Sequence, residues 1–385
     1  MSDRKTLRDA HIVICQKRLV HYRLAFFERL RERLAREGVR LSLVHGAASA
    51  EEALRQDGAE LPWAESVRLR EFFGGRAYWM PLPKGLRGAD LVVVTQENKI
   101  LSNYARQLAR PFRRQRLAFW GHGRNFQSGR PGGWRERWKR FWTGRVDWWF
   151  AYTELSRRAV EAQGYAPERI TVLNNAIDGE GFRADLAGTG EDLPAFRAGQ
   201  GIALDAPVAI YCGSLYEDKR LGLLVAAGEI MAKRLPGFRL LVLGAGPEEN
   251  MLRAAATTRP WLCLLGMRKG RDKALAFRAA SVLLNPGAVG LHVIDSFISG
   301  CPLVSLAEAR HGPEIAYLEH GRNALLLDRD DAGAFADAAC GLLADAGRLA
   351  AMRAACEEAG RRYTLDAMVE NFARGALAAL AAPKR

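Results

Sequence analysis

The stretch Leu283–Val304, LLNPGAVGLHVIDSFISGCPLV, contains the pattern that decides the fold. The apolar run Val282–Leu284 has the length of a buried strand, and Pro286 ends it. Apolar residues recur at helical spacing through Leu291–Ile298, and Gly300 marks the end of that helix. The stretch therefore predicts a strand, a glycine-containing loop and a helix in direct succession.

The loop of this unit is a candidate phosphate site. Gly290, Leu291 and His292 place backbone N–H groups at the predicted helix N-terminus. The peptide dipoles leave partial positive charge there, which favours anions. An ordinary connection between a strand and a helix has the same pattern, because every α/β protein contains several of them. The neighbouring segments have to decide between these two interpretations.

Strands and helices alternate along the chain in two series, which predicts an α/β protein. The first series begins with the strand His11–Cys15 and the second with the strand Val208–Cys212. Short parallel strands joined by helices form an open doubly wound sheet. We expect two tandem Rossmann-like domains facing a cleft, with the ligand at the carboxyl ends of the strands. The predicted boundaries are an N-terminal domain at 1–180, a linker at 181–206, a C-terminal domain at 207–362 and a last helical segment at 363–385.

The composition is that of a folded, soluble protein, with 49% apolar and 26% charged residues. No apolar run approaches the ~18 to 20 residues of a membrane-spanning helix. The first residues, MSDRKTLRDA, lack the apolar core of a secretory signal. The six cysteines show no metal-ligand spacing. We therefore expect a cytoplasmic protein with reduced thiols, no metal and no cofactor.

The net charge of +14 is concentrated in one segment. Twelve Lys and Arg residues lie between Arg106 and Arg145, and Glu136 is the only acid among them. Such a concentration of positive charge requires an anionic partner, which is nucleic acid, anionic lipid or a phosphorylated substrate.

The stretch Pro131–Phe150 of this segment is rich in tryptophan as well as arginine. Trp134, Trp138 and Trp142 would share one helical face. Tryptophan surrounded by Lys and Arg is typical of a helix that lies in anionic lipid headgroups. The alternative is that these tryptophans pack into the first domain. Aromatic and basic residues together also bind single-stranded nucleic acid, but no recognised nucleic-acid module is present, so we expect no nucleic-acid partner.

The segment Gly213–Arg220, GSLYEDKR, directly follows a predicted strand of the second series. Gly213 allows the backbone to approach a ligand closely, and Lys219 with Arg220 can supply positive charge to a diphosphate. A solvated basic loop is the alternative interpretation.

Two other glycine or acidic patterns are less specific. The segment Gly244–Glu249, GAGPEE, is similar to a dinucleotide fingerprint, but Glu249 stands where a small residue permits close packing. We therefore do not expect dinucleotide binding. Asp330 and Asp331 form part of a D-x-D pattern that could hold a metal-bound nucleotide. They directly precede a predicted helix, so we interpret one of them as its N-cap.

His122 lies between two glycines in the segment WGHGR, at the predicted carboxyl end of a strand. An imidazole in this position can meet a ligand as a hydrogen-bond partner or an electrophile. A purely structural histidine is the alternative.

Taken together and in order, these segments resemble the retaining GT-B glycosyltransferases of family 4, the group 1 glycosyl transferases, over nearly the whole chain. GSLYEDKR resembles the G-R-x-x-x-x-K segment of that family, whose basic residues hold the donor diphosphate. Gly213 and Lys219 match this pattern. Ser214 stands at the arginine position, so Arg220 is expected to supply part of the charge.

The stretch 283–304 is similar to the E-x7-E region of the family. Gly287 stands at the first glutamate, which touches the donor sugar, and Asp295 stands at the second, which holds the ribose hydroxyls. The resemblance implies that Asp295 binds the ribose and that the backbone of Gly290, Leu291 and His292 binds phosphate. The glycine at position 287 leaves the identity of the donor sugar open.

The remaining similarities assign further residues. LVLGAGPEENML is similar to the family's G-x-G-P strand end at Gly244, and LLGMRKG resembles the turn that contacts the nucleobase, here Met267 and Arg268. WGHGR resembles the segment whose histidine reaches the reaction centre, which implies that role for His122. The implied acceptor-binding residues are His21, Tyr22, Arg23 and Arg124.

The resemblance implies transfer of a sugar from a nucleoside-diphosphate donor to an acceptor hydroxyl with retention, with His122 and Lys219 as catalytic residues. The last helix, Leu365–Leu380, is expected to cross back to the first domain. The basic, tryptophan-rich segment favours a lipid-linked glycan or cell-surface polysaccharide as acceptor, at the inner face of the cytoplasmic membrane. The alternatives are a sugar-nucleotide epimerase or hydrolase of the same fold, and a non-catalytic sugar-nucleotide-binding subunit, which the missing glutamate at position 287 favours.

Overall fold

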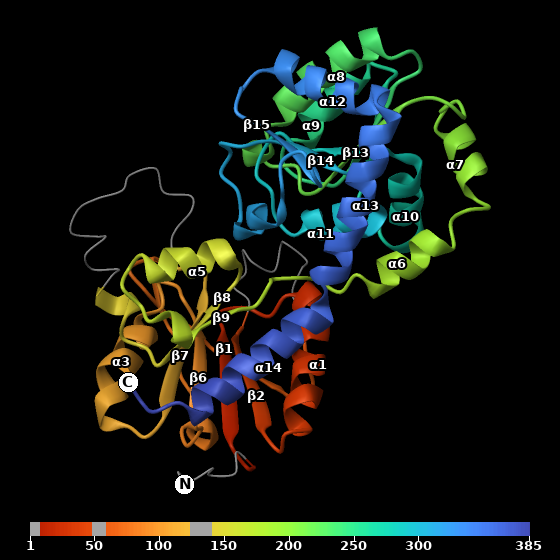
Figure 1. Cartoon of the computed structure of the whole chain (residues 1–385). Coiled ribbons are helices and arrows are strands. Elements are labelled where there is room, and N and C mark those ends of the chain that lie inside the picture. Colours follow the sequence, from red (N-terminus) through yellow and green to blue (C-terminus); the bar gives the residue numbers. More distant parts are fainter. Residues whose placement is uncertain (1–7, 48–58, 124–140) are drawn as a thin grey trace. The chain divides into compact units, whose positions relative to one another are not determined.

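The computed structural model describes residues 8–47, 59–123 and 141–385, which form two compact units. Unit 1 consists of Met1–Asp178 together with Leu365–Arg385, and unit 2 consists of Gly179–Thr364. Each unit has a parallel β-sheet with helices packed on it (Figure 1). The predicted α/β class with two Rossmann-like units is confirmed.

The sheet of unit 1 has seven parallel strands in the order β3-β2-β1-β6-β7-β8-β9. These strands are β1 (His11–Gln16), β2 (Arg40–Gly46), β3 (Ala64–Val67), β6 (Leu91–Thr95), β7 (Arg116–Gly121), β8 (Trp148–Ala151) and β9 (Ile170–Val172). The helical elements are η1 (His21–Arg23), α1 (Leu24–Ala35), η2 (Lys84–Leu86), α3 (Leu101–Ala109), η3 (Arg110–Phe112), α5 (Glu154–Glu161), η4 (Pro167–Arg169) and α14 (Leu365–Ala381).

Alternate residues of the unit 1 strands supply two hydrophobic cores, one on each face of the sheet. Ile12 and Ile14 of β1 belong to the core that also contains buried residues of α1 and α14. Val13 and Cys15 belong to the core that contains Ile100, directly before α3. The helices α1 and α14 lie side by side on the first face (Figure 1). The last helix of the chain is therefore part of unit 1.

Three short strands of unit 1 have no counterpart in the sequence prediction. They are β3 and the antiparallel hairpin of β4 (Arg70–Phe72) and β5 (Ala77–Trp79). All three residues of β4 are exposed, and none of β3 is buried. Strands of three or four residues with at most one buried position leave no alternating apolar pattern in the sequence, so periodicity could not find them.

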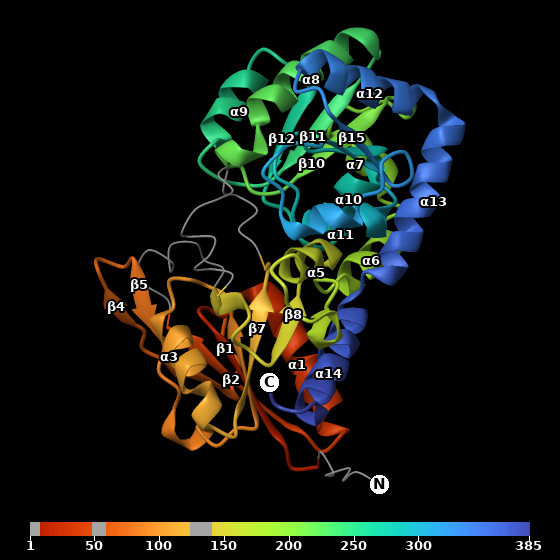
Figure 2. The same ribbon diagram turned by 60° about the vertical axis from the view of Figure 1, so that its left-hand side comes forward.

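The sheet of unit 2 has six parallel strands in the order β12-β11-β10-β13-β14-β15. These strands are β10 (Val208–Cys212), β11 (Arg239–Leu243), β12 (Leu262–Gly266), β13 (Val282–Leu284), β14 (Leu303–Leu306) and β15 (Ala324–Leu327). The helical elements are α6 (Glu180–Ala187), α7 (Leu193–Gly199), η5 (Glu217–Lys219), α8 (Leu221–Arg234), α9 (Glu249–Ala256), α10 (Gly270–Ala279), α11 (His292–Ser299), η6 (Pro313–Tyr317), α12 (Ala332–Ala344) and α13 (Ala346–Arg362). The helices α8 and α12 pack together on one face of this sheet (Figure 2).

The strand and helix predicted from the stretch 283–304 are confirmed as β13 and α11. Gly300 ends α11 in the left-handed conformation, with φ of 65°. A residue without a Cβ adopts this conformation at little cost, which is why glycine terminates so many helices.

The predicted linker at 181–206 is wrong, because this segment forms α6 and α7 and belongs to unit 2. The ring of Phe182 packs edge-on against Phe277 of α10, with centroids 5.3 Å apart. Buried Arg197 donates hydrogen bonds to the carbonyls of Ala203, Ala206 and Ala279. One aromatic ring and one arginine fix these helices, so the sequence shows little apolar periodicity there.

Among the helices of the described ranges, none combines the length and the apolar composition that a bilayer crossing requires.

Candidate functional site

The strand order of unit 2 changes direction between β10 and β13, which are paired neighbours. β10 leads into Gly213–Arg220 and β13 leads into Asn285–Leu291. In a doubly wound sheet, ligands bind where the order reverses, because the two adjacent connections go to opposite faces. The two loops that the sequence singled out for donor binding therefore start at the topological switch point.

These two loops are joined by hydrogen bonds. The Lys219 ammonium donates to the carbonyl of Ala288, and the Ala288 N–H donates to the carbonyl of Asp218 at 2.9 Å. Burial lowers the pKa of Lys219, and the charge of Asp218 opposes this effect. An ammonium has three donors, and the described residues supply one acceptor for them, the Ala288 carbonyl.

Gly287 explains how the loops come so close. A Cβ at this position would overlap the carbonyl of Asp218 and lie 2.5 Å from the Cα of Lys219. The backbone of Lys219 therefore occupies the space that a side chain at 287 would need. The packing of the lysine loop therefore leaves no room at position 287 for the glutamate of the pattern described above.

The backbone N–H groups of Gly290, Leu291 and His292 lie at the start of α11, as predicted. None of the three has a hydrogen-bond acceptor among the residues that the structure describes. No atom lies within 4 Å of a Cβ built on Gly290, so the space beside this residue is open. Free N–H groups at the N-terminus of a helix form a site that favours an anion.

The His292 side chain adds a polar atom at the same place. Burial, followed by the charges of Lys219 and Lys273, lowers the pKa of His292 to about 3. The ring is therefore neutral at pH 7. Its Nε2 is buried and has no hydrogen-bond partner in the described part of the chain. A buried polar atom without a partner is costly, so a bound ligand that pairs with it would gain affinity.

Two residues that sequence reasoning missed support the loop before α11. His311 Nδ1 accepts a hydrogen bond from the Val289 N–H at 3.1 Å, and its Nε2 donates to the carbonyl of Leu306 at 2.9 Å. The pKa of His311 is lowered, mainly by burial. The lowered pKa favours the neutral ring with its proton on Nε2. Glu314 is buried, and its carboxylate lies against Gly312, whose N–H donates to the Val289 carbonyl. The contacts to Val289 span more than 20 residues, so no local spacing could indicate them.

Asp295 is 6% exposed and forms an ion pair with Lys273 at 2.7 Å. Burial raises the pKa of Asp295, whereas Lys273 opposes this effect. The Lys273 ammonium also lies over the ring of Phe182, 4.6 Å from its centroid. The sequence singled out Asp295 but not Lys273, because the pair joins α10 to α11 across 22 residues.

Gly213 and Gly244 meet where the ends of β10 and β11 lie side by side. Gly244 has φ of 152°, and a Cβ on it would overlap the carbonyl of Gly213. Ser214 is exposed, and its carbonyl accepts a hydrogen bond from the Tyr211 hydroxyl at 2.8 Å. The glycines of these two segments thus permit close backbone packing. The same close packing accounts for Gly244 in the dinucleotide-like pattern.

Arg220 follows Lys219 in the left-handed conformation, with φ of 57°. Its guanidinium forms an ion pair with Asp330 at 2.5 Å. The neighbouring Asp331 is the N-cap of α12 and accepts a hydrogen bond from the Ala334 N–H at 2.7 Å, which confirms the capping interpretation. Arg220 would have to exchange this partner to reach a diphosphate.

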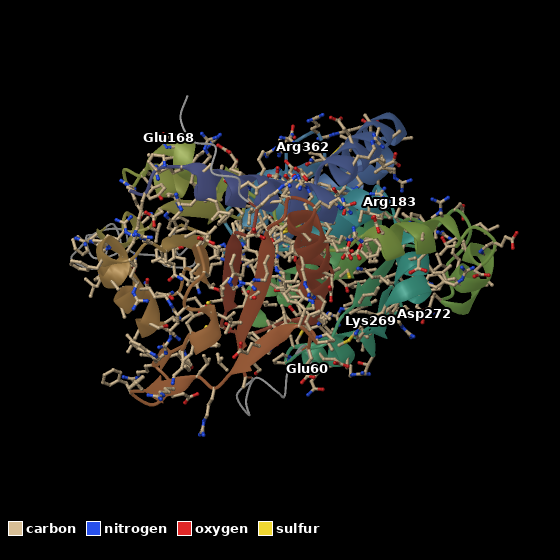
Figure 3. The ribbon with its side chains drawn as sticks, turned by 90° about the horizontal axis from the view of Figure 1, so that it is seen from below. Glu60, Glu168, Arg183, Lys269, Asp272 and Arg362 are labelled. Carbon is tan, nitrogen blue, oxygen red and sulfur yellow. The ribbon has the colours of Figure 1, made fainter. Side chains whose placement is uncertain are left out.

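The turn after β12 is exposed. Met267 is 67% exposed, and Arg268 pairs with Asp272 at 3.3 Å. Lys269 and Asp272, at the start of α10, are exposed as well (Figure 3). The turn can therefore be reached by a ligand.

The described residues contain no group of three or more His, Cys, Asp and Glu side chains arranged to bind a metal. All six cysteines are free. Cys212 lies at the end of β10, where burial raises its pKa to about 12. A thiol with such a pKa is protonated at pH 7 and is a poor nucleophile.

In unit 1 the strand order reverses between β1 and β6. Arg23, which follows β1, is 9% exposed and donates to the Asn175 side chain at 2.7 Å. Its guanidinium lies over the rings of Trp120 and Tyr152. Among the described residues, Arg23 forms no ion pair with a carboxylate. The neighbouring His21 and Tyr22 are exposed. Arg23 is thus a buried cation at the switch point of its unit.

His122 lies at the carboxyl end of β7, and its ring packs on Tyr152 with centroids 4.4 Å apart. A Cβ on Gly121 would lie 2.6 Å from the Cβ of Gln96, and one on Gly123 would lie 2.5 Å from Val160. Desolvation by the surrounding protein and the charge of Arg23 lower the pKa of His122 to about 4. His122 is exposed, so water weakens the effect of desolvation and the effect of the Arg23 charge. Each of these effects favours the neutral imidazole.

Part of the predicted tryptophan face lies outside the described residues, namely Trp134 and Trp138, and so does Arg124. Trp142 is described and is 9% exposed. Its ring packs edge-on against Tyr104, with centroids 4.8 Å apart. For Trp142, packing into the first unit is therefore the correct interpretation.

Two family models match the chain. Residues 25–180 match the model described as Glycosyltransferase Family 4, and residues 206–345 match the one described as Glycosyl transferases group 1. The lipopolysaccharide core biosynthesis glycosyltransferase LpsE of Rhizobium meliloti is 30% identical over 166 residues, which is 42% of this chain and 47% of the relative. The alpha-monoglucosyldiacylglycerol synthase of Acholeplasma laidlawii is 25% identical over 150 residues, 37% of each chain. The chain thus spans less than half the length of these two relatives.

Solved structures match over almost the whole length. HepE from Anabaena in complex with UDP has a TM-score of 0.70 at 17% identity and covers 96% of this chain and 100% of its own. WaaG, a glycosyltransferase involved in lipopolysaccharide biosynthesis, has a TM-score of 0.59 at 13% identity and covers 94% and 98%. At such identities the likeness concerns the fold alone. The two domain matches and the fold together place the chain among the glycosyltransferases of the GT-B fold.

Proposed function

We propose that the protein transfers a sugar from a nucleoside-diphosphate donor to an acceptor hydroxyl with retention, as family 4 enzymes do. The observation that carries the proposal is the junction of the Gly213–Arg220 and Asn285–Leu291 loops. There the Lys219 ammonium lies beside the loop whose following N–H groups have no acceptor among the described residues. An ammonium and free amides in one place suit the diphosphate of a donor.

The reaction breaks the bond between the anomeric carbon and the diphosphate oxygen, and the acceptor oxygen bonds to the same carbon. Negative charge develops on the leaving diphosphate. Lys219 and the N–H groups of Gly290, Leu291 and His292 would stabilise that charge. The acceptor's proton passes to the departing phosphate oxygen, so attack on the same face of the sugar preserves the configuration.

Gly287 bears on the mechanism as well. The family places a carboxylate at this position against the donor sugar, and here no side chain fits. The sugar must therefore be held by other groups, for which His292 Nε2 is the candidate within unit 2, while His122 keeps its proposed catalytic role. The base and ribose would be held by the turn at Met267 and by Asp295.

The donor and acceptor are proposed from the relatives. HepE was crystallised with UDP and with UDP-glucose, so we propose a UDP-sugar as donor. LpsE acts in lipopolysaccharide core biosynthesis and the Acholeplasma enzyme makes a glucosyldiacylglycerol. We propose a lipid-linked glycan or lipopolysaccharide core as acceptor, reached at the inner face of the cytoplasmic membrane.

Lys219→Ala tests the proposal directly. Removal of a charge that is needed in the transition state should lower turnover by roughly 100- to 1,000-fold and weaken UDP binding. Lys233→Ala is the matched control, because Lys233 is 73% exposed on α8 and, among the described residues, pairs only with Glu229. Turnover and UDP affinity should be measured with both variants. Equal turnover in Lys219→Ala and Lys233→Ala would remove the phosphate role of Lys219.

The glycine at 287 also favours a second candidate, a subunit that binds the sugar nucleotide without turning it over. An assay with donor alone and with donor plus acceptor separates the possibilities. Transfer requires both substrates, a hydrolase or epimerase consumes donor alone, and a binding subunit consumes neither.

A further inference from the structure

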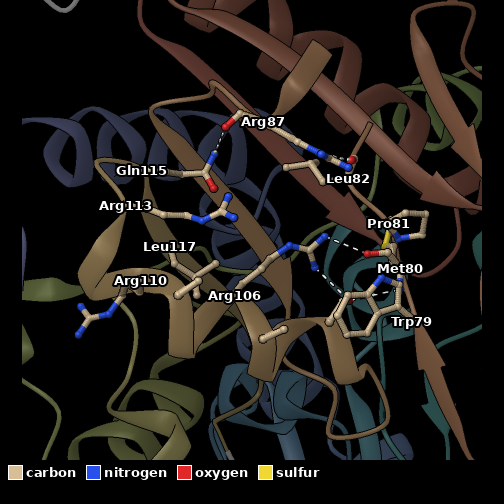
Figure 4. A pocket seen from close by; sticks show the side chains of 13 residues that line it. Trp79, Met80, Pro81, Leu82, Arg87, Arg106, Arg110, Arg113, Gln115 and Leu117 are labelled. Atoms are coloured by element: carbon tan, nitrogen blue, oxygen red, sulfur yellow. Dashed lines mark hydrogen bonds between the residues drawn. The ribbon is translucent and has the colours of Figure 1, made fainter. Parts of the chain in front are cut away.

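Unit 1 contains a pocket of about 240 Å³ that none of the predicted site residues lines (Figure 4). One wall is the segment 79–87, and the other is α3 with η3. Leu117 at the start of β7 lies between these walls. His122 follows the other end of β7, a strand of 6 residues. At ~3.3 Å per residue, the pocket and His122 lie on the order of 20 Å apart.

The pocket is strongly basic. Arg87, Arg106, Arg110 and Arg113 line it, and within the described part of the chain no Asp or Glu does. Arg110 forms an ion pair at 2.7 Å with Asp147, which does not line the pocket. The other three guanidinium groups are left without a carboxylate among the described residues.

Neutral groups hold two of these three guanidinium groups in place. Arg106 donates to the Ser102 hydroxyl at 3.0 Å and to the Met80 carbonyl at 3.0 Å. Arg87 donates to the carbonyl of Leu82 at 3.3 Å. None of these three neutral partners cancels a charge, so the like charges repel each other unless an anion binds. The planar guanidinium with its paired donors fits the oxygens of a phosphate group.

Apart from Ser102 and Gln115, the remaining lining is apolar and includes Trp79, Leu82 and Leu117. Around the pocket, large apolar side chains face solvent. Phe112, the last residue of η3, is 90% exposed, and Leu108 on α3 is 57% exposed. Trp79 is 38% exposed at the rim itself. Exposed apolar residues beside unpaired arginines match the chemistry of a lipid bilayer, where acyl chains lie next to anionic headgroups.

We propose that this pocket binds the phosphate of an anionic phospholipid and docks unit 1 on a membrane. The phosphate lies among Arg87, Arg106 and Arg113, while Phe112 and Leu108 enter the headgroup region. The surface differs from the tryptophan face expected from the sequence, of which Trp142 is buried. The proposal does not depend on glycosyl transfer, because its readout is binding to lipid.

The test is sedimentation of the full-length protein with vesicles of phosphatidylcholine, with and without phosphatidylglycerol. Wild type should bind only the anionic vesicles. Each charge near an anionic surface is worth roughly a factor of five, so Arg113→Glu should weaken binding roughly thirty-fold. Arg36→Glu is the control, because Arg36 is exposed at the end of α1 on the opposite face of the sheet. It should bind within about two-fold of wild type.

Ala105→Phe tests the pocket without changing any charge, since Ala105 lines it. Filling the space should weaken binding to anionic vesicles at least several-fold. Arg87→Glu serves as a second charge variant if Ala105→Phe melts early, and should match Arg113→Glu. Equal losses in Arg36→Glu and Arg113→Glu, or unchanged binding in both Ala105→Phe and Arg87→Glu, would overturn the proposal.

A titration with glycerol phosphate separates the two sources of phosphate. Competition with anionic vesicles at millimolar concentrations supports a shared phosphate site. Tight binding of glycerol phosphate by a protein that ignores the vesicles would assign the pocket to a soluble ligand and overturn the lipid proposal.

Discussion

The clearest lesson at the scale of single residues comes from Gly287. Comparison with the family pattern shows that a glutamate is missing there, but not why. The structure supplies the reason, because the backbone at Asp218 and Lys219 fills the space of a side chain. A sequence records the residue at each position, whereas this constraint arises from two loops 69 residues apart.

We predict that Gly287→Ala destabilises the protein, whereas Gly290→Ala does not. The added Cβ at 287 would overlap the lysine loop, and such overpacking costs about 1–3 kcal/mol. Gly290 is the matched control in the same loop, because a Cβ there meets no atom within 4 Å. Thermal unfolding measures both variants, at roughly 2–4 °C per kcal/mol for a unit of this size. Equal melting temperatures for both variants would show that the loops can separate at little cost.

His122 gives a prediction about pH. Its pKa is lowered from 6.5 to about 4. Between pH 4 and pH 6.5, His122 therefore binds fewer protons in the folded protein than in the unfolded chain. Stability from this group is therefore present above pH 6.5 and is lost as the pH falls towards 4. We expect transfer to be insensitive to this group from pH 6.5 to 8 and to decline below about 5. A pH–rate profile in which His122→Gln retains the same acid limb would remove His122 as its cause.

At the scale of elements, the sequence predicted buried strands and their following helices well. β1, β6, β10, β11 and β13 are continuous apolar runs, which is the pattern of a parallel sheet covered on both faces. It failed where the elements have no apolar repeat, as in β3–β5 and in α6 and α7. The same division holds for the site. Loops at strand ends could be found, but Lys273, His311 and Glu314 come from other elements and could not.

We predict that α14 is essential to the stability of unit 1. Phe372 is fully buried and stacks on Phe150 at 4.2 Å, and it also contacts Trp120 and Phe26. Phe372→Ala should cost about 3–5 kcal/mol. Arg374→Ala is the control on the same helix, because Arg374 is exposed and its side chain donates to Asn371 on the same helix. It should change stability by no more than about 0.5 kcal/mol. Denaturant unfolding monitored by tryptophan fluorescence would measure both, and a similar small effect of the two variants would contradict the prediction.

At the scale of the whole molecule, the chain passes from unit 1 to unit 2 and returns. Unit 2 is one continuous segment with its own core, whereas unit 1 needs residues from both ends of the chain. Compact segments with a complete core fold independently. The two units should therefore respond differently when they are produced alone.

We predict that the polypeptide Gly179–Thr364 folds and binds UDP, because both loops of the proposed phosphate site and the turn at Met267 belong to unit 2. The segment 1–178 alone should not fold, since the core around Phe372 is removed with α14. Addition of 365–385 through a flexible linker to 1–178 should restore its unfolding transition. Circular dichroism and calorimetry with UDP measure these outcomes. A folded unit 2 that fails to bind UDP at concentrations that saturate the full-length protein would show that the donor site is incomplete within unit 2. An unfolded unit 2 would instead show that its core depends on unit 1.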